Sequence, residues 1–266
     1  MRIFFVPLQI GICSLIRRVE DKTLRMMKIR LFTLPNLVTL CNLMCGSMAA
    51  ITALTGGDLR LAFWLIVAAA VCDFLDGMTA RLLNSYSGIG VELDSLADMV
   101  SFGFAPSAIL FALYGGAESH WSWSEGVVAC GGVLLFLVAC ASALRLAKFN
   151  VDDTQHEEFS GLPTPAMALF FAALGWLVAA GRLELCREVL LLLAALFAWL
   201  MISPIRMFSF KFKNLSWREN GLRYLFAGVT LLLLVLLKVG AVAVIIPLYV
   251  VVSLVRWLLT YSKKAE

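Results

Sequence analysis

Long apolar stretches dominate this sequence and restrict the class of fold that it can adopt. Eight of them are predicted as hydrophobic helices, most with the roughly 17–25 residues that cross a bilayer. They cover approximately residues 34–54, 60–84, 92–114, 126–149, 164–181, 187–204, 221–238 and 240–260. With 61% hydrophobic and only 15% charged residues, the chain is more apolar than soluble domains are. We therefore predict an all-α, polytopic membrane helix bundle with about eight transmembrane helices.

The positions of the lysines and arginines predict how these helices are oriented. With the N-terminus placed inside, 18 of the 22 basic residues fall on the inner side of the membrane. The other four are Arg60, Arg182, Arg187 and Lys238. Because cytoplasmic segments carry an excess of basic residues, we predict an integral protein of the cell inner membrane with both termini in the cytoplasm.

The segment between the second and third predicted helices carries four carboxylates in an otherwise apolar chain. It reads CDFLDGMTARLLNSYSGIGVELDSLAD, residues 72–98, with Asp73 and Asp76 on one helix and Asp94 and Asp98 on the next. Spacings of three and four residues put each pair on one helix face. Since a short turn makes the two helices antiparallel, we expect the four carboxylates to converge on the cytoplasmic side.

Converging carboxylates repel one another or take up protons unless cations neutralise them. Oxygen ligands of this kind suit magnesium or manganese. Small residues at Gly77, Ala80 and Gly90 leave room for a ligand close to the backbone, and Arg81 can bind phosphate oxygens. This pattern predicts metal-assisted chemistry on a pyrophosphate. An ion or proton pathway is the alternative, because carboxylates also line such pathways in transmembrane helices.

The same segment resembles the signature of the CDP-alcohol phosphatidyltransferases, D-x2-D-G-x2-A-R-x8-G-x3-D-x3-D. Every fixed position is met, at Asp73, Asp76, Gly77, Ala80, Arg81, Gly90, Asp94 and Asp98. The resemblance implies a core of six helices at residues 32–205, with the active site on its cytoplasmic side. A C-terminal pair of transmembrane helices at residues 206–266 lies outside this core.

Enzymes of this family transfer a group from a CDP-linked lipid to an alcohol and release CMP. The resemblance implies that Asp73, Asp76 and Asp94 bind two divalent cations, Mg or Mn, at the pyrophosphate. It also implies that Asp98 shares a cation and is the catalytic base. The residues that would contact CDP-diacylglycerol are Asn36, Thr39, Gly77, Ala80, Arg81, Ser87 and Gly90. Family members tend to be homodimers, so we expect a homodimer; we expect no nucleic-acid partner.

Two further stretches bear on the acceptor alcohol. ALRLAKFN at residues 143–150 and FSGLPTPAMA at residues 159–168 resemble the integral-membrane phosphatidylserine synthases. Arg145 and Lys148 would place cations where the carboxylate of L-serine binds, and the products would be phosphatidylserine and CMP. Glycerol phosphate, inositol phosphate and choline are alternative acceptors. A cation transporter is a further alternative, although transporters often show repeats and midplane sites, whereas these carboxylates cluster at one face.

The N-terminal segment, residues 1–31, combines a short apolar stretch with a basic cluster. We predict an amphipathic, basic segment at the membrane surface, unless translation begins at Met26 or Met27.

The seven cysteines form no CxxC pair, and most lie within apolar stretches. We predict buried thiols rather than a disulfide framework or a zinc site.

Overall fold

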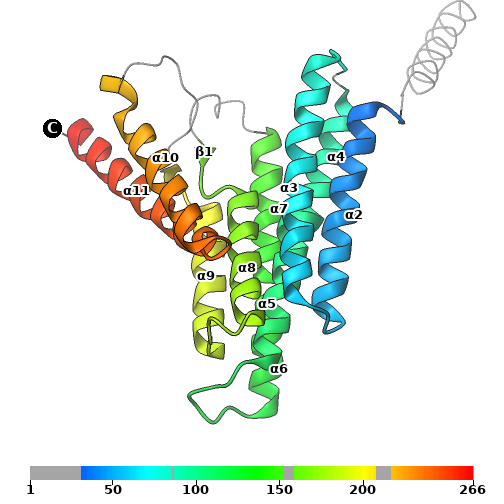
Figure 1. Cartoon of the computed structure of the whole chain (residues 1–266), viewed down its shortest axis with the longest axis vertical. Helices are drawn as coiled ribbons and strands as arrows, with labels where there is room; N and C mark the ends of the chain where they lie inside the picture. Colours follow the sequence, from blue (N-terminus) through cyan, green and yellow to red (C-terminus); the bar gives the residue numbers. More distant parts are fainter. Residues whose placement is uncertain (1–30, 86, 152–158, 208–216, 266) are drawn as a thin grey trace, which may run out of the picture.

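The computed structural model describes residues 31–85, 87–151, 159–207 and 217–265, and nearly all of them are helical (Figure 1). The helices are α2 (Leu34–Leu54), α3 (Leu59–Leu82), α4 (Gly88–Asp98), the π-helical segment η1 (Met99–Phe104), α5 (Ala105–Gly116), α6 (Glu125–Leu134), α7 (Leu137–Val151), α8 (Thr164–Ala179), α9 (Arg187–Ile202), α10 (Trp217–Leu237) and α11 (Gly240–Ala265). The predicted all-α bundle is confirmed. The predicted amphipathic segment lies outside the described residues, apart from Leu31.

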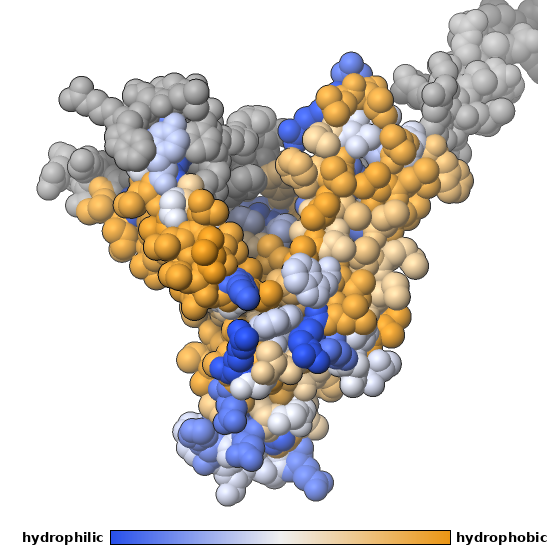
Figure 2. All heavy atoms as spheres, in the orientation of Figure 1, coloured by the Kyte–Doolittle hydropathy of each residue, from blue (hydrophilic) through white to orange (hydrophobic). Residues whose placement is uncertain are grey.

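Six stretches of the described chain are long and apolar enough to cross a bilayer. They are α2, α3, α4 with η1 and α5, α6 with α7, residues 220–237 of α10 and residues 240–259 of α11. The remaining two predicted spans, α8 and α9, have 16 residues each. Figure 2 shows apolar side chains over the flanks of the molecule and polar side chains at its lower end, near the connection between α5 and α6. The chain is an integral membrane protein.

Two predicted helices differ in detail from the sequence-based expectation. The third begins at Gly88 because Ser87 caps it: the Gly90 backbone N–H donates to Ser87 Oγ at 3.1 Å. Directly after Asp98 this helix widens into η1 and then continues as α5. The fourth is interrupted between α6 and α7, where the N–H groups of Leu135 and Phe136 bond to carbonyls three residues earlier.

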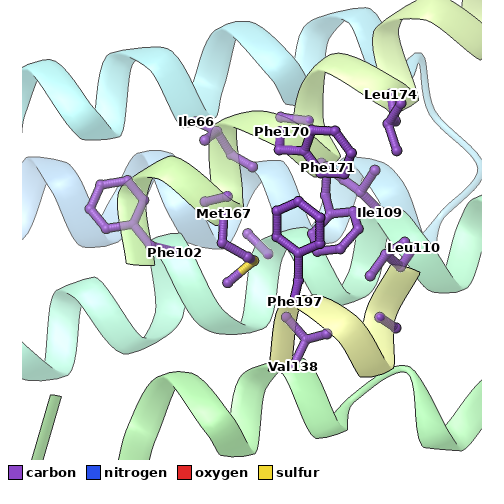
Figure 3. Close-up of a cluster of buried hydrophobic side chains, with 14 of the residues drawn as sticks. Ile66, Phe102, Ile109, Leu110, Val138, Met167, Phe170, Phe171, Leu174 and Phe197 are labelled. Carbon is purple, nitrogen blue, oxygen red and sulfur yellow. The ribbon is translucent and has the colours of Figure 1, made fainter. Parts of the chain in front are cut away.

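The hydrophobic core joins α3, η1, α5, α7, α8 and α9 (Figure 3). Phe170 of α8 stacks on Phe197 of α9 with ring centroids 4.4 Å apart and planes 9° apart. Ile66 of α3 and Phe102 of η1 are completely buried in the same cluster. This packing fixes α3, which carries Asp73 and Asp76, and η1, which begins directly after Asp98.

Helix α2 packs against α3 and against η1 at very close range. A Cβ atom at Gly46 would lie 2.2 Å from Ser101 Oγ, so only glycine fits without a shift of the helices. Ser101 Oγ also donates a hydrogen bond to the backbone oxygen of Asn42 at 3.0 Å. Small residues let membrane helices approach each other in this way. The contact fixes the part of α2 that carries Asn42.

A short antiparallel pair of strands, β1 (Phe159–Ser160) and β2 (Arg206–Met207), leads the chain into α8. Gly161 follows β1 with φ at +78°, and its N–H donates to the Ile205 oxygen at 2.9 Å. A Cβ atom there would lie 2.2 Å from the Met201 oxygen, so this turn requires glycine. The turn holds the start of α8 against the end of α9.

The prediction that the cysteines are buried is wrong: of the six in the described residues, three are exposed and three are only half-buried. All six are free thiols, and Cys41, Cys130 and Cys140 are exposed on the surface of the bundle. An apolar surrounding sequence does not distinguish a cysteine in the core from one on the outer surface. The outer surface of a membrane bundle faces lipid and is as apolar as its core.

Candidate active site

The four predicted aspartates lie together on the hairpin formed by α3 and α4. One carboxylate oxygen from each of Asp73, Asp76 and Asp94 lies within 4.8 Å of the other two. Asp98 is close enough for its charge to interact with those of Asp73 and Asp94. Asp76 and Asp98 are buried, and the other two are half-buried. The helix spacing that predicted one convergent set of carboxylates therefore corresponds to their arrangement in the structure.

Helix α2 supplies hydrogen-bond donors to this cluster. Thr39 Oγ1 lies 2.6 Å from Asp76 Oδ2 and donates to it. Asn42 Nδ2 donates to Asp98 Oδ1 at 3.1 Å. All four of these side chains are buried. Each donor fixes the orientation of one carboxylate, so α2 positions the site although it carries no acidic residue of the cluster.

These donors leave much of the negative charge uncompensated. Asp94 Oδ1 is buried and makes no hydrogen bond, and within the described residues no ion pair involves any of the four aspartates. Hydrogen bonds to charged groups contribute about 1.5–3 kcal/mol each, whereas burial of an unpaired ion costs several kcal/mol. An all-oxygen set with an orphaned oxygen fits a hard divalent cation. The aspartate cluster can therefore hold metal ions.

A cavity of about 200 Å³ opens beside the carboxylates. Its lining includes every residue that the sequence predicts to contact CDP-diacylglycerol: Asn36, Thr39, Gly77, Ala80, Arg81, Ser87 and Gly90. Asp76 and Asp94 line the same cavity. Around the position of a Cβ atom at Gly77, only Arg81 Nη2 comes within reach, at 4.0 Å, so the cavity stays open beside that backbone. The structure thus brings two of the clustered carboxylates and the Arg81 guanidinium together at one cavity.

The two basic residues predicted to bind serine, Arg145 and Lys148, have different positions relative to the aspartates. Arg145 of α7 lies near Asp98, and the charges of the two side chains interact. Its Nη1 donates to Thr164 Oγ1 at 3.3 Å, while its Nε is buried without a hydrogen-bond partner. Lys148 is exposed and has no described contact with the aspartates. The structure therefore brings Arg145 to the cluster and leaves Lys148 apart from it.

Sequence reasoning missed three residues at or near the site: Asn42, Thr164 and Tyr249. Asn42 continues a row of polar residues on one face of α2, after Asn36 and Thr39, and this three-residue spacing could have revealed it. Tyr249 lies on α11 and interacts electrostatically with Arg145. Its apolar helix offers no comparable signal, because only the packing of α11 on α8 brings it there.

Comparison with known proteins agrees with this geometry. Residues 32–202 match the CDP-alcohol phosphatidyltransferase family. The matched range contains the four aspartates and every residue that lines the cavity beside them. The chain belongs to this family.

Several similar proteins of the family bear the name CDP-diacylglycerol–serine O-phosphatidyltransferase. The one from Helicobacter pylori is 31% identical over 240 residues, which cover 88% of this chain and 94% of that protein. The one from Methanocaldococcus jannaschii is 33% identical over 179 residues, which cover 66% of this chain and 74% of that protein. The one from Bacillus subtilis is 36% identical over 135 residues, which cover 50% of this chain and 69% of that protein. The similarity to this phosphatidyltransferase group thus extends well beyond the aspartate hairpin.

Adding one methyl group to the cavity wall tests whether this space binds the nucleotide lipid. A Cβ atom at Gly90 would lie 3.0 Å from Ser87 Oγ and 3.2 Å from Asn36 Oδ1. We expect Gly90→Ala to displace both side chains and to weaken CDP-diacylglycerol binding about tenfold, or about 1.4 kcal/mol, in a titration of the purified protein.

Gly88→Ala is the matched control, because it lies in the same first turn of α4 and its added Cβ would meet no side chain or neighbouring element within 4 Å. Its affinity should equal that of the unmodified protein. Equal affinities for the two variants would contradict the assignment of the cavity.

Proposed function

We propose that this protein transfers the phosphatidyl group of CDP-diacylglycerol to the hydroxyl of L-serine, giving phosphatidylserine and CMP. The observation that carries the proposal is the carboxylate cluster itself, two members of which, Asp76 and Asp94, line a cavity together with Arg81 and Gly77. Such a site fits a lipid diphosphate, whose charges need cations. The choice of serine rests on the shared name of the relatives.

The carboxylates of Asp73, Asp76 and Asp94 are proposed to hold two divalent cations, magnesium or manganese. When bound, such ions neutralise the diphosphate and stabilise the charge that develops as CMP leaves. Thr39 keeps Asp76 in one orientation through the 2.6 Å hydrogen bond. Arg81 is exposed at the same cavity, so its guanidinium can bind phosphate oxygens there. Asn36, Ser87, Ala80 and Gly90 line the same cavity and are proposed to contact the nucleotide.

Asp98 is proposed as the general base. Its carboxylate would take the proton of the serine hydroxyl while that oxygen forms a bond to the lipid-linked phosphorus. The bond from this phosphorus to the CMP oxygen breaks, and CMP leaves with the bonding electrons. Asn42 holds one Asp98 oxygen through its amide, which leaves the other oxygen for the incoming hydroxyl.

Arg145 is proposed to bind the carboxylate of serine. It lies near Asp98, so a serine held there would have its hydroxyl close to the base. The unpartnered Nε gives it a donor for the second oxygen of a carboxylate, beside the Nη1 that bonds to Thr164. Lys148 would add only a weaker attraction, because it is exposed.

The orientation in the membrane follows from the distribution of basic residues. We place the α3–α4 hairpin and both termini on the cytoplasmic side of a cell inner membrane, where water-soluble serine and CMP are exchanged. We also expect two copies to associate as a homodimer, which cross-linking of the detergent-solubilised protein can test.

A panel of acceptors tests the proposed reaction directly. With CDP-diacylglycerol and purified protein, CMP release should require serine and should be far slower with glycerol phosphate, inositol phosphate or choline. Excess chelator should abolish release, and added manganese or magnesium should restore it. Release with another alcohol but not with serine would overturn the acceptor, and full turnover in chelator would overturn the role of the aspartates.

The roles within the aspartate set can be separated by two isosteric substitutions. Asp98→Asn removes the proposed base but leaves three cation ligands, so transfer should fall by about 10²–10⁴-fold while CDP-diacylglycerol still binds. Asp94→Asn should weaken nucleotide and metal binding together, because Asp94 belongs to the convergent trio. A transfer rate that falls less than tenfold in Asp98→Asn would contradict a single base at Asp98. Equal losses of CDP-diacylglycerol affinity in the two variants would contradict it as well.

The binding of serine by Arg145 predicts an effect on one substrate only. Arg145→Ala should raise the KM for serine at least about tenfold, the scale of one charge-assisted hydrogen bond, with little change in the KM for CDP-diacylglycerol. Arg145→Lys should recover part of the loss. Lys148→Ala, the comparison variant on the same helix, should change the serine KM about twofold or less. Equal changes for both substrates after Arg145→Ala would mean that Arg145 acts through the fold instead.

A further inference from the structure

Hydrogen bonds join two connections at the end of the bundle opposite the aspartates, which is the lower end in Figure 1. One connection links α5 to α6, and the other links α8 to α9. The Arg187 backbone N–H donates to the backbone carbonyl oxygen of Glu118 at 3.0 Å. Glu188 Oε1 accepts hydrogen bonds from Ser119 Oγ at 2.6 Å and from the His120 N–H at 3.1 Å. The two connections are therefore held in a defined relative position.

Three metal-ligating side chains converge where these connections meet. One ligand atom from each of His120, Cys186 and Glu188 lies within 4.8 Å of the other two. Zinc binds nitrogen, sulfur and carboxylate oxygen at about 2.0–2.3 Å, so ligands on one ion lie up to roughly 4 Å apart. Small side-chain rotations would bring all three onto one ion. The set of imidazole, thiolate and carboxylate differs from the all-oxygen set of the aspartates.

The Glu188 carboxylate provides a second, independent indication of a cation. Its Oε2 is buried and has no hydrogen-bond partner, although its Oε1 has two donors. The adjacent Arg187 does not compensate it: the guanidinium lies over the Tyr114 ring, 5.5 Å from its centroid, and Nε donates to the backbone carbonyl oxygen of Tyr114. A buried carboxylate oxygen without a partner is costly. A bound cation would satisfy it, and the donors to Oε1 orient it as an outer hydrogen-bond shell does.

We propose that His120, Cys186 and Glu188 form a second metal site, separate from the active site, that takes a borderline transition-metal ion such as Zn²⁺ or Co²⁺. Thiolate and imidazole ligands select such ions over magnesium. A cavity of about 870 Å³, which His120 and Cys186 help to line, leaves room for a water molecule as the fourth ligand. The ion would fasten the α5–α6 connection to the start of α9. The proposal does not depend on the reaction proposed above.

The thiolate ligand gives this site its own spectroscopic signature. Co²⁺ added to the purified, reduced full-length protein should produce a thiolate-to-cobalt charge-transfer band, which Zn²⁺ should displace. Co²⁺ at the all-oxygen aspartate cluster cannot give that band. Cys186→Ser should lose it, whereas Cys130→Ser, which alters an exposed cysteine on α6, should keep it. His120→Ala and Glu188→Gln should each weaken cobalt binding at least tenfold.

Two results would overturn the proposal. One is the absence of a thiolate band in the unmodified protein at saturating Co²⁺. The other is an undiminished band in Cys186→Ser, which would assign it to other thiols such as Cys45 and Cys72, whose side chains lie together between α2 and α3. An unchanged gel-filtration profile and an unchanged thermal unfolding midpoint would show that Cys186→Ser is folded, so that loss of its band reports on the ligand.

Discussion

Four carboxylates held close together inside a membrane bundle are the constraint on which the rest of the site depends. Asp76 and Asp98 are buried, and Asp94 has a buried oxygen with no partner. Two hydrogen bonds from α2 cannot offset this charge, because the repulsion and the desolvation exceed what such bonds contribute. Bound cations would neutralise this charge, and the proposed function assigns that role to two divalent ions beside an anionic substrate. The same negative charge therefore determines both how the site is built and which ligands it can bind.

The helices around the hairpin are packed so that this charge stays in one place. Gly46 lets α2 approach Ser101 closely, and the resulting contact positions Asn42 to bond to Asp98. The π-helical segment begins directly after Asp98, and such widened turns are frequent at functional sites. On the other side, the turn at Gly161 fixes the start of α8, where Thr164 holds Arg145. Asp98, the proposed base, thus has Asn42 as a neighbour on one side and Arg145 on the other.

Much of this arrangement follows from the sequence. The apolar stretches predict the helix bundle, and the spacing of the aspartates predicts which helix faces meet. The residues Asn36 and Thr39 were assigned through the family resemblance, and they line the same cavity as Gly77. The sequence did not predict Asn42, the break between α6 and α7, or the proximity of Tyr249 to Arg145. These features depend on how helices distant in the sequence pack, and a periodic apolar pattern carries little of that information.

The lower end of the bundle illustrates the same limit. His120 is 66 positions from Cys186, so no local spacing rule connects the two. Hydrogen bonds between the two connections, from Ser119 and His120 to Glu188 and from the Arg187 N–H to the Glu118 backbone oxygen, bring these side chains together. Metal sites built from two connections of a membrane bundle therefore require the fold before they can be identified.

Direct location of the cations is the most decisive measurement. X-ray data collected at the manganese absorption edge, from crystals grown with Mn²⁺ and CDP-diacylglycerol, would place the ions without reference to activity. The account predicts anomalous peaks bounded by the carboxylates of Asp73, Asp76 and Asp94, in contact with the diphosphate. A bound diphosphate with no anomalous peak among these carboxylates would contradict it.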